Sequence, residues 1–180
     1  ERAARMTTGE ETPVELPVFV PATLPAPGML LPVDKPTPTL EQIVAFPGEI
    51  GLAAASLITG GLLARFPKLR IALSHGGGSI QALVPRMQFA WEKQRALRDA
   101  MATAPVDAAR ALYYDDLLYS PQAIRALVEL VGETRVMIGT DYPFAIMDAD
   151  PAARIASLGL PDSVVQQLRW KNAAAWLGRI

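Results

Sequence analysis

The feature that most constrains this fold is the alternation of short apolar runs with longer segments of helical periodicity. The runs are apolar on both faces, as parallel strands covered by helices are. Such alternation is typical of an α/β fold with a parallel sheet. Four strand–helix units make half of a (β/α)8 TIM-type barrel, which takes ~250 residues. We therefore expect residues 1–180 to be part of a single barrel domain. The predicted strands are residues 16–20, 69–74, 112–115 and 135–139.

Capping residues and prolines locate the helices. Thr39, with Gln42 three residues later, fits a capping box for a helix that Pro47 should interrupt. Ser120 and Asp150 are the predicted N-caps of two later helices. The predicted helices cover residues 39–65, 79–100, 120–131, a segment from 151, and 161–177.

Proline is concentrated near the start of the chain, where nine of the 16 prolines lie between Pro13 and Pro47. Proline fixes φ and lacks an N–H donor, so this stretch is predicted to be mostly irregular. Residues 21–38 read as a Pro-rich surface loop. An ordered functional loop and a disordered linker both remain open for it.

Composition excludes several function classes. The chain has no cysteine, which rules out disulfides, Cys-ligated metals and thiol nucleophiles from its residues. Its net charge of −1 gives no electrostatic footprint for nucleic acid or an anionic membrane. No apolar run reaches the ~18 residues of a membrane span, and the start lacks the apolar core of a signal peptide. We expect a cytoplasmic protein that binds neither nucleic acid nor membrane.

His75 and Asp141 are the strongest candidates for chemistry, because each follows a predicted strand, where barrel active sites are built. An imidazole can act as an acid or base near neutral pH, and a carboxylate can bind a metal or orient a partner. The alternatives are a hydrogen-bonded turn histidine and an Asx-turn. The three glycines after His75 favour a functional role, because they let the backbone approach a ligand closely.

Three weaker signals remain. Arg86, on the helix after His75, could bind a carboxylate in a bidentate fork or be a solvated surface charge. One residue of the segment 113–116 could line a pocket, although packing at the strand end is favoured. His-Gly-Gly-Gly also occurs in the oxyanion loop of esterases, but the chain has no G-x-S-x-G nucleophile elbow.

Three segments together resemble a known family. They are GGLLARFPKLRIALSHGGG at residues 60–78, RVMIGTDYPF at 135–144 and WKNAAAWLG at 170–178. They are similar to the C-terminal half of the aminocarboxymuconate-semialdehyde decarboxylase family, within the metal-dependent amidohydrolase superfamily. The resemblance implies that this chain supplies roughly the second half of a (β/α)8 barrel, strands 5–8 with their helices.

The resemblance also implies an activity and a role for each site residue. The expected activity is metal-dependent decarboxylation, a carbon–carbon lyase reaction, of an aromatic or muconate-type carboxylic acid by a homodimer. His75 would either activate the metal-bound water or transfer the proton. Asp141 would be catalytic as a ligand of a divalent metal, zinc being the first expectation. Tyr142 and Phe144 would shape the substrate pocket. Arg86 would reach across the dimer interface toward the substrate carboxylate.

The chain departs from the family pattern at the metal ligands. It contains no H-x-H pair, and Val18-Phe19-Val20-Pro21 lacks the histidine of the family's V-F-V-H-P. Of the family's usual ligands, only Asp141 is present. Two alternatives therefore stay open: a metal-dependent hydrolase or hydratase of the same superfamily, and a non-catalytic half-barrel that serves as a binding module.

Overall fold

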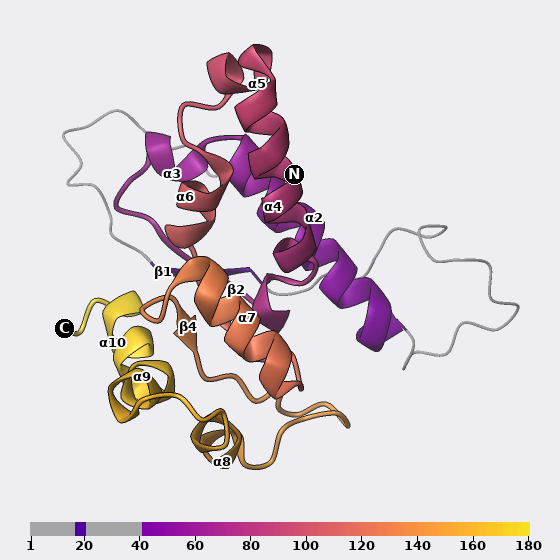
Figure 1. The fold of residues 1–180 in the computed structure, drawn as a ribbon. Helices are drawn as coiled ribbons and strands as arrows, with labels where there is room; N and C mark the ends of the chain where they lie inside the picture. The colour runs from indigo at the N-terminus through magenta and orange to yellow at the C-terminus, as the bar shows by residue number, and fades with distance from the viewer. Residues whose placement is uncertain (1–16, 21–40) are drawn as a thin grey trace, which may run out of the picture.

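The computed structural model describes residues 17–20 and 41–180, and its centre is a parallel four-stranded sheet (Figure 1). The strands lie in sequence order, so each pairs with the next along the chain, as in Val18 with Ile71 and Ala72 with Tyr113. This confirms the predicted α/β fold with a parallel sheet. The strands are β1 (Pro17–Val20), β2 (Arg70–Leu73), β3 (Tyr113–Asp115) and β4 (Val136–Met137).

The first helical segment corrects the prediction at Pro47. The π-helical turn η1 (Glu41–Ala45) continues directly into α2 (Phe46–Thr59). Pro47 is the second residue of α2 and directly follows the π-helical turn, so the helical path continues through this proline. The interruption comes instead at Gly61, which has φ +63° and precedes the short helix α3 (Leu62–Arg65). Thr39 and the Pro-rich segment 21–38 lie outside the described residues.

The predicted helix 79–100 is two helices, α4 (Ile80–Lys93) and α5 (Arg95–Ala100). Gln94 between them is extended, with φ −116° and ψ 114°. The guanidinium of Arg98 donates to the carbonyls of Trp91 and Glu92 at 3.0 and 2.7 Å, which satisfies the end of α4. A short helix that the sequence did not predict, α6 (Pro105–Arg110), follows.

The later helices begin where local capping predicts. The Ser120 side chain accepts from the Ala123 N–H at the start of α7 (Pro121–Val131). Asp150 does the same for the Ala153 N–H at 3.0 Å, opening α8 (Pro151–Ala156). The last predicted helix is continuous through three segments: α9 (Asp162–Gln166), the π-helical turn η3 (Gln167–Lys171) and α10 (Asn172–Trp176).

The two faces of the sheet carry different cores. Leu73, Tyr114 and Val136 belong to the large hydrophobic cluster that the sheet forms with the helices. Figure 1 shows these helices gathered around the sheet. The alternate positions Ala72, Tyr113 and Met137 form a second, smaller cluster on which Trp176 packs. Met137 and Trp176 of this second cluster also line the cavity described below. Among the described helices, none combines the length and apolar character needed to cross a membrane.

Candidate active site

The carboxyl ends of the strands meet at one edge of the sheet, because all four are parallel. A cavity of about 500 Å³ lies there. It contains His75 after β2, Asp115 at the end of β3, and Asp141 after β4. The structure thus brings together the two residues singled out for chemistry. Tyr142 and Phe144, expected to shape the pocket, also line this cavity.

His75 stands on a turn that requires glycine. The turn η2 (His75–Gly77) has positive φ at His75 (+53°) and Gly76 (+58°). A Cβ on Gly76 would lie 2.7 Å from the Leu118 side chain, and one on Gly78 would collide with the carbonyl oxygen of Pro47. The close packing that these glycines permit holds His75 at the carboxyl end of β2.

The half-buried imidazole of His75 is subject to two opposing effects. Burial lowers the pKa of His75 below its ordinary value, and the negative charge of Asp141 raises it. Desolvation is the larger effect, so the imidazole is mostly uncharged at neutral pH. In that form it can accept a proton, and the nearby carboxylate stabilises the cation that results.

Asp115 is a site residue that the sequence did not select from segment 113–116. Its side chain is buried, and its Oδ1 accepts from the N–H of Gly76 at 2.8 Å and of Leu117 at 3.2 Å. Burial raises the pKa of Asp115 to about 7, although these hydrogen bonds oppose the rise. Asp115 therefore ties β3 to the His75 turn and is a titratable group in the cavity wall. Its position at a strand end, like that of His75 and Asp141, was the available signal.

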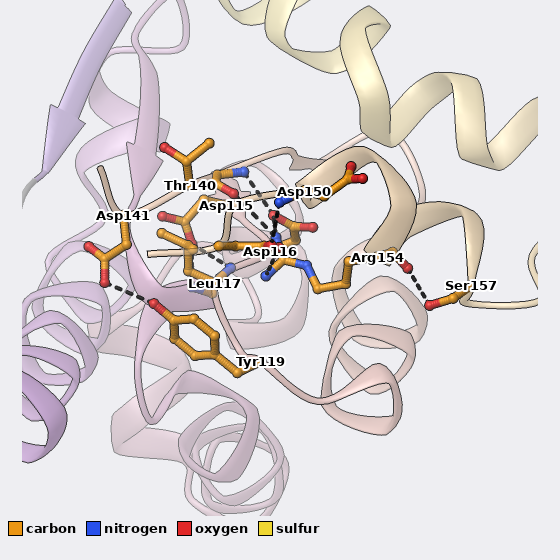
Figure 2. Close-up of polar contacts among 12 residues, drawn as sticks. Asp115, Asp116, Leu117, Tyr119, Thr140, Asp141, Asp150, Arg154 and Ser157 are labelled. Carbon is orange, nitrogen blue, oxygen red and sulfur yellow. Dashed lines mark hydrogen bonds and ion pairs between the residues drawn. The ribbon is translucent and has the colours of Figure 1, made fainter. Parts of the chain in front are cut away.

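The loop after β4 is held by a buried ionic network (Figure 2). Asp116 has a fully buried side chain, and its Oδ1 accepts from the Gly139 N–H at 2.8 Å and from Arg154 Nη2 at 3.0 Å. Arg154 Nη1 lies 3.1 Å from Asp148 Oδ2, an ion pair whose geometry falls short of a hydrogen bond. Burial raises the pKa of Asp116, while the Arg154 charge lowers it. The network fixes the backbone two residues before Asp141.

Tyr119, which the sequence did not indicate, completes the polar contacts of the site. Its phenol O–H donates to Asp141 Oδ2 at 2.9 Å, as Figure 2 shows. Burial and this hydrogen bond raise the pKa of Tyr119, so the phenol keeps its proton and acts as a donor.

The sequence profile described as Amidohydrolase matches residues 11–179. The chain belongs to the amidohydrolase family. It is 31% identical over 138 residues to the 2-amino-3-carboxymuconate-6-semialdehyde decarboxylase of Caenorhabditis elegans, a match that covers 75% of this chain and 34% of that protein. The chain thus spans about a third of the length of this curated relative.

Solved structures share the fold of this amidohydrolase chain. One is the 2,6-dihydroxybenzoate decarboxylase from Rhizobium, with a TM-score of 0.77 and 20% identity over 91% of this chain and 51% of that one. Another is a dihydroxybenzoic acid decarboxylase from Polaromonas sp., solved with bound manganese and the inhibitor 2-nitroresorcinol. Its TM-score is 0.70, with 20% identity over 91% of this chain and 50% of that one.

The donor set of the described residues does not fit a complete metal site. A protein-bound catalytic metal such as zinc normally takes three protein ligands. Within 17–20 and 41–180, no group of three or more His, Asp or Glu side chains is placed to hold an ion. Asp141 offers one carboxylate, and His75 is the single histidine of the chain. These two side chains fall short of the three protein ligands that such a site takes.

Arg86 is not brought to this cavity by its own chain. It is exposed on α4 and absent from the residues that line the cavity. Its expected role needs a second subunit, so it stays a prediction.

Proposed function

We propose that this amidohydrolase is a decarboxylase of aromatic or muconate-type carboxylic acids. In this proposal the chain supplies strands 5–8 of a (β/α)8 barrel, and residues 1–180 are part of one domain. The parallel sheet in sequence order and the match to about half of each of the two solved structures support this arrangement. The similarity to three decarboxylases, one of a muconate semialdehyde and two of dihydroxybenzoates, supports the choice of reaction.

The observation that carries the proposal is the convergence of His75, Asp115 and Asp141 in one cavity from three neighbouring strand ends. In a decarboxylation the carbon–carbon bond breaks, CO₂ leaves with the carboxylate oxygens, and the carbon takes a proton in its place. His75 is the imidazole of this cavity, and we assign the proton transfer to it rather than to Asp115, whose Oδ1 is occupied by the N–H groups of Gly76 and Leu117. Asp141 holds its charge beside the imidazole and stabilises the protonated form.

The remaining residues bind and enclose the substrate. Phe19, Tyr142 and Phe144 all line the cavity and give it aromatic side chains suited to a planar acid. Arg86 would come from the other subunit of a homodimer and pair with the substrate carboxylate. Asp141 would be one ligand of a divalent metal, either zinc or the manganese seen in the Polaromonas relative, with further ligands from outside the described residues. The proposal places the protein in the cytoplasm.

The deciding experiment is product analysis with the purified protein and added divalent metal. Candidate substrates are 2,6-dihydroxybenzoate and 2-amino-3-carboxymuconate semialdehyde. Release of CO₂ with the decarboxylated product supports the proposal. A hydrolysed or hydrated product would support the alternative chemistry of the superfamily. Saturable binding without turnover would support a binding module.

The variant His75→Asn tests the assigned role. Asparagine is similar in size but cannot exchange a proton near pH 7, so turnover should fall by roughly 10²–10⁴. Arg95→Met, on the exposed face of α5, is the matched control and should keep the wild-type rate. Retention of more than about half the rate in His75→Asn would contradict the assignment.

A further inference from the structure

Three residues of the site share an unusual backbone conformation. In the part of the chain that the structure describes, the non-glycine residues with positive φ are His75 (+53°), Tyr119 (+53°) and Asp141 (+59°). This left-handed region is disfavoured for residues with a Cβ, and most of all for bulky side chains such as tyrosine. The three follow the neighbouring strands β2, β3 and β4 in turn. Such conformations persist where the surrounding structure holds them, and they cluster at functional sites.

The conformation of Tyr119 is imposed by its neighbours on both sides. The side chain of Leu118 packs directly over Gly76, and the Leu118 N–H donates to the Asp116 carbonyl at 2.8 Å. On the other side, Ser120 is committed to capping α7. The loop is therefore anchored before and after Tyr119.

The side chain of Tyr119 is not held there by burial. It is 48% exposed, and its contact with Asp141 is a hydrogen bond between partly solvated groups. A pair of this kind contributes little to stability. The same residue lines a second cavity, of about 430 Å³, that also contains His75. His75 thus lines one cavity together with Tyr119 and the larger cavity together with Asp141.

We propose that Tyr119 is a positioning residue of this site: its phenol O–H fixes the Asp141 carboxylate and thereby the charge presented to His75. Part of this inference, the effect on turnover, rests on the proposed function. The positional effect does not, because it can be read from His75 without any substrate.

The test uses the single histidine of the chain as a probe. The imidazole ¹⁵N and ¹³C signals of His75 are recorded at one fixed pH in wild type, Tyr119→Phe, Asp141→Gly and the double variant. Tyr119→Phe removes only the hydroxyl, and Asp141→Gly removes the carboxylate while tolerating positive φ. Thermal midpoints check the fold of each variant.

We expect Tyr119→Phe to shift the His75 signals and to change the thermal midpoint by less than about 2 °C. The shift should vanish in the Asp141→Gly background, because Tyr119 acts through that carboxylate. If the wild type decarboxylates an acid, Tyr119→Phe should lower kcat roughly tenfold with KM little changed.

Three results would overturn the inference: unchanged His75 signals in Tyr119→Phe, the same shift with and without Asp141, or a large loss of thermal stability, which would make the role structural. Absence of turnover in the wild type would count against the proposed function alone, and the signals of His75 would still decide the role of Tyr119.

Discussion

Replacing Arg154 by methionine should show how much the Asp116–Arg154–Asp148 network contributes to the free energy of unfolding. Methionine keeps most of the apolar stem but removes the guanidinium. Asp116, with a fully buried side chain, would lose its charged donor and keep backbone N–H groups such as that of Gly139, while Asp148 would lose its ion pair with Arg154. Among the described residues, Asp116 Oδ2 already accepts no hydrogen bond.

The magnitude follows from burial. Removing one member of a buried ion pair costs about 3–5 kcal/mol, because the other charge is left without a partner. The side chain of Arg154 is 12% exposed and that of Asp116 0%, so solvent does little to reduce this cost. For a domain of this size each kcal/mol lowers the thermal midpoint by about 2–4 °C, which gives a fall of roughly 6–20 °C. Burial already raises the pKa of Asp116, so protonation should make the loss smaller at acidic pH.

Urea and thermal unfolding of three variants decide the matter. Arg95→Met is the matched control, because the Arg95–Asp99 ion pair is exposed: the side chain of Arg95 is 86% exposed and that of Asp99 68%. Such a pair should contribute under about 0.5 kcal/mol to the free energy of unfolding. Arg154→Met combined with Asp116→Asn should recover part of the loss, because it also removes the stranded charge. A loss in Arg154→Met no larger than in the control, or no recovery in the double variant, would refute the reasoning.

Other predictions test single residues. Burial raises the pKa of Asp115 from 3.8 to about 7, so the folded chain binds this proton more tightly than the unfolded chain. Stability from this group is greatest below about pH 4 and falls by at most roughly 4 kcal/mol as the pH rises to about 7. The difference in unfolding free energy between wild type and Asp115→Asn should fall over that window, and a constant difference would contradict the reasoning. Gly78→Ala should destabilise the protein by more than about 2 kcal/mol, because φ is +62° and a Cβ would strike the Pro47 carbonyl. Gly48→Ala, in open space on α2, should instead stabilise it by about 0.5–1 kcal/mol. Thermal unfolding of both glycine variants checks that order. Under the proposed function, Arg86→Ala should raise KM for a carboxylate substrate or weaken the proposed homodimer. An assembled structure with Arg86 in bulk solvent would exclude its proposed role.

The sequence by itself determined the features that depend on near neighbours. The Ser120 and Asp150 caps hydrogen-bond to N–H groups three residues ahead, so short-range patterns suffice to find them. Alternation of apolar strands and helices predicted the parallel sheet. It also placed His75 and Asp141 at strand ends, and parallel strands bring such ends to one edge.

Only the tertiary structure decided which other residues join them. Tyr119 meets Asp141 across 22 residues, Asp115 meets Gly76 across 39, and the Asp116–Arg154 pair spans 38. Side chains reach such partners only once the strands are paired and the loops are packed, so no periodicity or capping rule along the chain records these contacts.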